Sequence, residues 1–180
     1  MIVFWCYIYL PPMNTSEMLT SKADAREKIK AQYNLPKRSK ILVAVSFSNT
    51  SMTDFLLAWL EVLPVNFIVF WTGINKINAK NIVYSDSKEN FDMLWIDALL
   101  WNCENIILEK KMRLWVVPIM NAKNYLWKIL SEFNPARGEW NSYLYEDNSS
   151  WSAYYALIRY IENHNFPFDN RNLIKNVIWV

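Results

Sequence analysis

The sequence predicts an α/β domain with a mostly parallel sheet. Short apolar runs rich in β-branched and aromatic residues alternate with longer segments in which apolar residues recur at helical spacing, which is the pattern of βαβ units. The clearest run, residues 41–47 (ILVAVSF), is apolar almost throughout, as expected for a strand covered by helices on both faces. No repeat or linker divides the 180 residues, which suffice for one well-buried core.

The expected elements follow from these patterns in chain order. They are a strand at 1–10, a polar connector at 11–20, a helix at 21–33, a strand at 41–47, a helix at 51–63, a strand at 66–71, a short strand at 81–84, a short helix at 90–96, a strand at 98–101, a helix carrying Glu109, a strand at 114–117, a helix at 121–133, a strand at 143–145 and a helix at 151–162. In the tail, residues 172–178 fit either a helical turn or a strand. The expected organisation is an N-terminal strand and connector (1–20), a central domain (21–163) and a C-terminal tail (164–180).

Capping residues and prolines set several of these boundaries. Ser21 and Ser51 each open a helix and are followed three residues later by an aspartate, as in a capping box. Pro36 and Pro64 end those two helices, and Pro118 stops the strand before it, because proline lacks the N–H that regular structure uses.

Apolar spacing also predicts which helix faces are buried. The helix at 21–33 has a charged face and should pack on the outside of the domain. The expected inward residues of the helix at 51–63 are Met52, Phe55, Leu56, Trp59, Leu60 and Leu63. Those of the helix at 151–162 are Trp151, Tyr154, Tyr155, Ile158 and Ile161.

Composition argues against several functions. The net charge of +2 comes from 19 basic and 17 acidic residues without a basic run, so nucleic-acid binding is not expected. Two isolated cysteines and one histidine give no zinc pattern, and no metal site is expected; lone cysteines fit a reducing, cytoplasmic compartment. No stretch reaches the length of about 18 apolar residues that a membrane span needs. Residues 1–10 lack the basic start and cleavage site of a signal peptide, and suit a strand buried in the fold, a strand paired with a partner, or a membrane-surface contact.

Residues for acid–base or nucleophilic catalysis are scarce. His164 is the one histidine, and it follows a helix, where an exposed position is expected. Neither a phosphate-binding lysine loop nor G-x-G-x-x-G is present, which disfavours P-loop and dinucleotide enzymes. No catalytic residue is therefore assigned.

Polar turns after three predicted strands are the candidate site, because α/β sheets bind ligands beyond the carboxyl ends of their strands. Hydroxyls, amides and the free N–H groups of a helix start can hold a phosphate or a sugar, and a carboxylate in the following helix can accept hydrogen bonds from a ribose. Each turn also reads as an ordinary helix cap. The candidates are Ser46, Ser48, Asn49, Asn102, Cys103, Glu104, Asn105, Glu109 and Asn121.

From Ser21 to Asn163 the chain resembles the C-terminal, donor-binding domain of GT-B glycosyltransferases, in particular the UDP-N-acetylglucosamine transferases. The segments that carry the resemblance are AREKIKAQYNLPKRSKILVAVSFSNT, EVLPVNFIVFWTG, NIVYSDSKENFDMLWIDALLW, WNCENIILE and WVVP. The resemblance implies one Rossmann-like, three-layer domain, like one half of a GT-B enzyme.

The family's functional residues transfer in part. Its ribose-binding glutamate matches Glu109, whereas its diphosphate-contacting glycines fall on Asn102 and Cys103 and its threonine on Ile106. Side chains at those positions would crowd a diphosphate. Its Gln-x-x-NA motif survives only as Asn121 and the alanine after it.

The resemblance implies a UDP-sugar as donor substrate, with no other cofactor. In the family's split enzymes, a donor-binding chain of this size acts with a membrane-associated, acceptor-binding partner, so a peripheral position at a membrane is one expectation. The alternative is a non-catalytic, homo-oligomeric interaction protein on a degenerate half-domain. Unrelated flavodoxin-like or Rossmann-like enzymes remain a third class, because fold alone does not set function.

Overall fold

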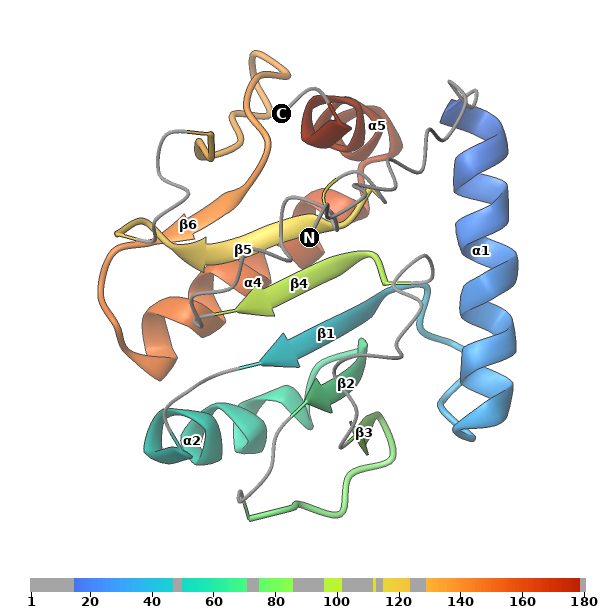
Figure 1. Cartoon of the computed structure of the whole chain (residues 1–180), viewed down its shortest axis with the longest axis vertical. Coiled ribbons are helices and arrows are strands. Elements are labelled where there is room, and N and C mark those ends of the chain that lie inside the picture. The colour runs from blue at the N-terminus through green and yellow to red at the C-terminus, as the bar shows by residue number, and fades with distance from the viewer. Residues whose placement is uncertain are drawn as a thin grey trace, which may run out of the picture.

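A parallel sheet of six strands organises the part of the chain that the structure describes, namely residues 15–46, 50–70, 75–85, 96–101, 112, 115–123 and 129–178 of a computed structural model. The strands are β1 (Leu42–Ser46), β2 (Asn66–Phe70), β3 (Ile82–Ser85), β4 (Ala98–Trp101), β5 (Val117–Asn121) and β6 (Tyr143–Tyr145). The helices are α1 (Thr15–Gln32), α2 (Thr50–Leu60), α4 (Ser150–His164) and α5 (Pro167–Ile178) (Figure 1). The predicted fold class, an α/β domain with a parallel sheet, is confirmed.

The strands lie in the order β3-β2-β1-β4-β5-β6, and every neighbouring pair is parallel. The chain thus builds outward from β1 to β3, returns to place β4 beside β1, and builds outward again to β6. This is the order of the doubly wound dinucleotide-binding fold, in which the direction of winding reverses between the two central strands. Here that switch point lies between β1 and β4.

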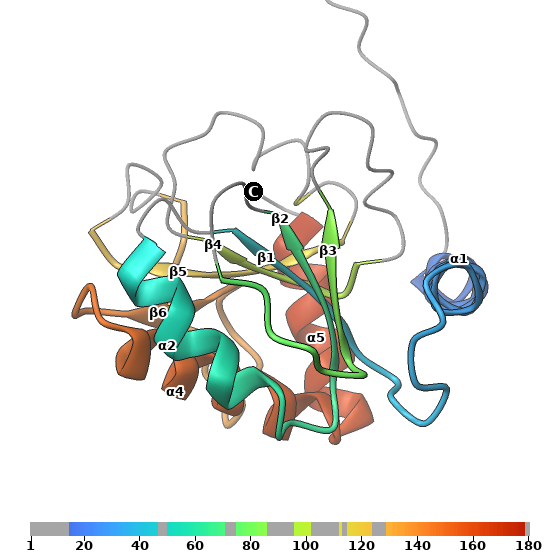
Figure 2. The same ribbon diagram turned by 90° about the horizontal axis from the view of Figure 1, so that it is seen from below.

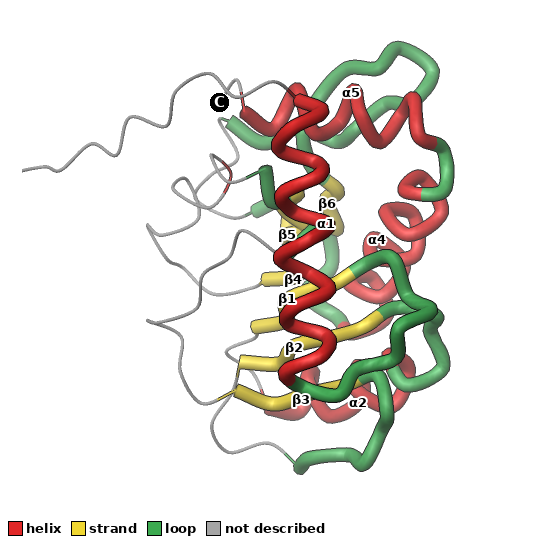
Figure 3. The backbone as a smooth tube through the Cα atoms, turned by 90° about the vertical axis from the view of Figure 1, so that its right-hand side faces the viewer, coloured by secondary structure: helices red, strands yellow, loops and turns green. Residues whose placement is uncertain are grey.

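The described helices occupy one face and one edge of the sheet. Figure 2 shows α2 and α4 side by side beneath the strands, and α1 seen end-on beside the sheet. Figure 3 shows α1 running across all the strands at their amino ends. The residues expected to form helices at 90–96 and around Glu109 lie almost entirely outside the described residues.

The core explains why the strands were predictable from the sequence. Every residue of β1, β2 and β4 is buried, and their side chains form one apolar cluster with the inner faces of α2 and α4. Strands buried on both faces read as continuous apolar runs. Truncating such a residue, for example Leu99 at 0% exposure, would cost about 2–5 kcal/mol of stability.

Two cations attach α1 to the amino end of β4. Arg26 Nη1 lies 2.7 Å from both carboxylate oxygens of Asp97, and Lys22 Nζ donates to the Ile96 carbonyl at 2.6 Å. Asp97 Oδ2 also accepts from the Leu42 amide at 2.9 Å, so one buried carboxylate joins α1, β1 and β4. The prediction that α1 simply shows a charged face to solvent is therefore incomplete.

The first helix starts earlier than expected. α1 begins at Thr15, so the predicted connector at 11–20 is wrong over its described part, and Ser21 lies inside the helix rather than capping it. Met18 packs with Trp115 and with Ile174 of α5, and this contact with distant residues extends the helix past the local capping signal.

Pro118 does not stop a strand but lies inside β5, opposite Leu99 of β4. The Val117 amide donates to Asp97 O at 3.0 Å, toward β4, so the Pro118 nitrogen faces the β6 side. Pairing with β6 begins one residue later, at Ile119, and the missing N–H therefore costs no bond in the ladder.

The helix predicted at 121–133 is wrong at both of its described ends. Asn121 belongs to β5, and residues 129–133 are not helical, with Glu132 bridging to Ser142 in parallel. Residues 124–128 lie outside the described residues. In contrast, the tail that the sequence left open is helical, as α5.

The buried face of α4 matches the prediction in part: Ile161 is buried and Tyr154 and Ile158 pack against the core, but the other two predicted residues are exposed. Its buried residues include Ala153, Ala156 and Tyr160, while Trp151 and Tyr155 are 65% and 59% exposed. The small alanines allow the helix to approach the sheet closely. Trp151 instead meets Trp59 of α2 edge-to-face at 5.5 Å.

Side chains close the outer edge of β6. The backbone N–H of Leu144 donates to Glu132 Oε2, and its carbonyl accepts from Arg159 Nη2 at 2.6 Å. Arg159 Nη1 also pairs with Glu132 Oε1. One residue pair thus satisfies the strand groups that would otherwise be open to another strand.

Candidate functional site

The strand ends that precede the predicted site lie together at the carboxyl edge of the sheet. Ser46, the last residue of β1, pairs in register with Trp101, the last residue of β4. Trp101 in turn pairs with Met120, one residue before Asn121 in β5. The carboxyl ends of β1 and β4 are therefore neighbours, at the switch point where doubly wound sheets bind ligands.

Most of the predicted site residues lie outside the described residues, and their roles stay predictions. These residues are Ser48, Asn49, Asn102, Cys103, Glu104, Asn105 and Glu109. The structure describes the other two candidates, Ser46 and Asn121.

Ser46 and Asn121 have largely structural surroundings. Ser46 is completely buried, so its side chain packs within the sheet layers. Asn121 Oδ1 accepts from the Lys123 amide at 2.8 Å, forming a tight Asx-type turn after β5, and its Nδ2 donates to Glu146 O at 3.4 Å. These surroundings give both residues a structural role, although neither caps a helix within the described part of the chain.

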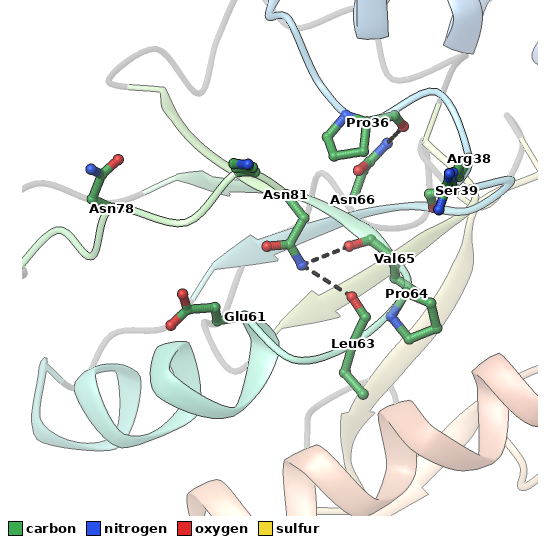
Figure 4. A pocket seen from close by; sticks show the side chains of 11 residues that line it. Pro36, Arg38, Ser39, Glu61, Leu63, Pro64, Val65, Asn66, Asn78 and Asn81 are labelled. Atoms are coloured by element: carbon green, nitrogen blue, oxygen red, sulfur yellow. Dashed lines mark hydrogen bonds between the residues drawn. The ribbon is translucent and has the colours of Figure 1, made fainter.

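A hollow of about 520 Å³ lies at the opposite, amino-terminal edge of the sheet, between the segments that lead into β1, β2 and β3 (Figure 4). Two asparagine side chains of its lining donate hydrogen bonds to backbone carbonyls. Asn81 Nδ2 donates to the carbonyls of Leu60, Leu63 and Val65 at 3.0–3.1 Å, and Asn66 Nδ2 donates to Pro36 O at 3.0 Å. The hollow is thus framed by groups that fix the turn between α2 and β2.

His164 is half-buried in the last turn of α4, which corrects the expectation of an exposed position. Burial holds the pKa of its imidazole below the ordinary value, and its Nδ1 lies 3.5 Å from the Tyr160 hydroxyl. Among the described residues, no group of three or more histidine, cysteine, aspartate or glutamate side chains is placed to hold a metal ion. No helix within those residues is long and apolar enough to cross a membrane.

Sequence reasoning missed the polar pairs that hold the domain together. Asp97 is separated from Arg26 by 71 residues and Glu132 from Arg159 by 27, so no local pattern links them. The one available signal was a charged residue, Asp97, directly before a buried strand.

Comparison with known proteins identifies the fold. No family model and no curated protein matches the sequence. Among solved structures, the chain is similar to the catalytic domain of starch synthase IV from Arabidopsis thaliana, solved bound to ADP and acarbose, with a TM-score of 0.67 and 12% sequence identity. The match covers 93% of this chain but 40% of the starch synthase chain. At this identity the likeness shows the fold alone: an α/β domain resembling one half of a GT-B glycosyltransferase.

Proposed function

We propose that this chain is the nucleotide-sugar-binding half of a glycosyltransferase and acts with a separate acceptor-binding partner. The observation that carries the proposal is the register of Ser46 with Trp101, which places the ends of β1 and β4 side by side at the switch point of a GT-B-like sheet. The starch synthase match, which carries ADP, supports a nucleotide as the ligand class. The chain spans 40% of the starch synthase chain that it matches, so the acceptor-binding partner belongs to the proposal alone.

In this proposal different residues contact different parts of the nucleotide-sugar. Glu109 accepts hydrogen bonds from the ribose hydroxyls, while the turns containing Ser48, Asn49 and Asn102 face the phosphates and sugar. The reaction is displacement of UDP from the sugar carbon by an acceptor hydroxyl, with the acceptor and its base supplied by the partner. A membrane-associated partner would bring the chain to the cytoplasmic surface of a membrane.

Titration calorimetry with UDP, ADP and UDP-sugars tests the proposal. We expect binding by the wild type and a loss of about tenfold or more for Glu109→Ala, because the ribose hydroxyls lose a charged acceptor. Glu61→Ala is the matched control, since Glu61 is an exposed carboxylate at the opposite edge of the sheet. An absence of binding at millimolar nucleotide, or an equal loss in both variants, would contradict the proposal.

Exposed aromatic side chains on two neighbouring helices support the second candidate, a non-catalytic, oligomeric interaction protein. Phe55 of α2 and Trp151 and Tyr155 of α4 are 59–66% exposed on two neighbouring helices. Exposed aromatic clusters are typical of protein interfaces. Light scattering over a range of concentrations should then show an oligomer that Trp151→Ser disrupts and Phe168→Ser, a change at an exposed residue of α5, does not. A monomer at every concentration would exclude this candidate.

A further inference from the structure

A second hollow, of about 310 Å³, lies where α4 meets α5 beside the amino end of β6. Its walls include Glu132, Tyr143, Arg159, Glu162, Asn163 and Asp169. These residues come from the edge strand, from the segment that bridges to it and from both helices. The hollow is therefore distinct from the carboxyl edge, where the nucleotide site is proposed.

Three buried hydrogen-bond donors of this lining have no partner within the described part of the chain. They are the Tyr143 hydroxyl, Arg159 Nε and Asn163 Nδ2. Tyr143 and Asn163 are only 3% and 7% exposed, so their donors are not open to bulk solvent. A buried donor left without an acceptor costs about 1–3 kcal/mol, and three in one place call for an explanation.

The other groups of the lining limit what could satisfy these donors. Arg159 pairs with Glu132, and within the described residues no ion pair joins Glu162 or Asp169, the other two carboxylates of the wall. An anion would be repelled by these carboxylates. A cation would be attracted but offers no acceptor for Arg159 Nε–H or for the Asn163 amide. A neutral molecule with several hydroxyls meets both needs, since each hydroxyl donates and accepts.

Aromatic rings complete a surface for such a molecule. Phe133 and Phe166 line the same hollow, and Phe166 is 60% exposed. Flat rings can cover the C–H face of a cyclic polyol while its hydroxyls reach the polar groups around them. The volume lies at the lower end of the range for small-molecule sites.

We propose that this hollow binds a neutral, cyclic polyhydroxylated molecule of about the size of a monosaccharide. The proposal goes beyond the nucleotide-sugar function and does not depend on it. Because the three donors are shielded, binding must shift the wall of the hollow, and the affinity is expected to be weak.

Nuclear magnetic resonance titration with three ligands that share one ring but differ in charge tests this proposal. Glucose should shift the side-chain amide signals of Asn163 and the backbone signals of Tyr143 and Glu162, saturating below about 50 mM. Glucose 6-phosphate and glucosamine should bind more weakly, because the first is an anion and the second a cation lacking one acceptor. No shift with glucose, or stronger binding of either charged ligand, would overturn the proposal.

Two variants and a matched control separate binding from structure. Tyr143→Phe and Asn163→Leu should each weaken glucose binding by about tenfold, yet leave the melting temperature unchanged or raised, because they remove an unpaired buried donor. Tyr145→Phe lies in the same strand, but its hydroxyl donates to Trp101 O at 3.4 Å, so this change should lower the melting temperature and preserve glucose binding. Unchanged glucose affinity in both variants would show that the donors serve no ligand.

Discussion

At the scale of single residues, the stability of the domain depends most clearly on the ion pair between Arg26 and Asp97. Both side chains are largely buried, at 14% and 9% exposure, and the carboxylate also accepts from β1. Arg26→Met would leave a buried carboxylate without its cation and should cost about 3 kcal/mol of unfolding free energy by urea denaturation. Adding Asp97→Asn should recover part of that loss, whereas Arg38→Met, an exposed change near the same edge, should stay within about 0.5 kcal/mol.

Lys22 gives the folded state a pH dependence. Burial lowers the pKa of its amine to about 8, partly opposed by the charge of Asp97, whereas the ordinary value is 10.5. Between these two values the unfolded chain binds more protons than the folded one, so the free energy of unfolding rises as the pH increases from about 8 to 10.5. The gain is on the order of 3 kcal/mol.

Lys22→Met tests this dependence because it removes the titrating group. Urea denaturation at several pH values should show a flatter rise between pH 8 and 10.5 than in the wild type. Lys28→Met, an exposed change on the same helix, should keep the wild-type slope. A wild-type slope in Lys22→Met would show that another group carries the dependence.

At the scale of elements, the outer edge of β6 depends on a side-chain pair rather than on another strand. Glu132→Ala removes the acceptor of the Leu144 amide and the partner of Arg159, and should destabilise the domain by about 1–2 kcal/mol. Glu139→Ala is the matched control, because Glu139 also lies near an arginine but both side chains are more than half exposed. Thermal unfolding of the two variants measures the difference; equal effects would mean that the edge pair is dispensable.

The elements of this domain differ in how well the sequence alone specifies them. β1, β2 and β4 were predicted to within about a residue or two at each end, because a strand buried on both faces is written as an apolar run. The segment at 129–133 was mistaken for helix, since Glu132 bridges to Ser142, a contact that the spacing of its own residues does not reveal. The α4 face was predicted only in part for a related reason: Ala153 and Ala156 are buried where the helix packs against the sheet.

At the scale of the whole molecule, the sequence predicted the class of fold and the edge of the sheet at which to search for a ligand site. It did not predict the side-chain pairs that stabilise the sheet. The strand register brings Ser46 beside Trp101, as the site prediction requires. Ser46 itself is fully buried, and Asn121 is engaged by its own turn, so the prediction now depends on the turn residues and Glu109. Nothing local to Asp97 or Glu132 could reveal partners so distant in the chain.

The position of α1 has a consequence for the order of folding. α1 precedes every described strand in the chain, yet its anchors at Ile96 and Asp97 follow 74 and 71 residues later, and Met18 contacts Ile174. The helix has no complete docking surface until β4 has joined the sheet, and such distant contacts form slowly. Pulse-labelling hydrogen exchange during refolding should therefore show α1 amides protected after those of β1 and α2. If the α1 amides are protected first, the helix folds as an independent unit. If they are protected last, the docking of α1 is the step that completes the domain.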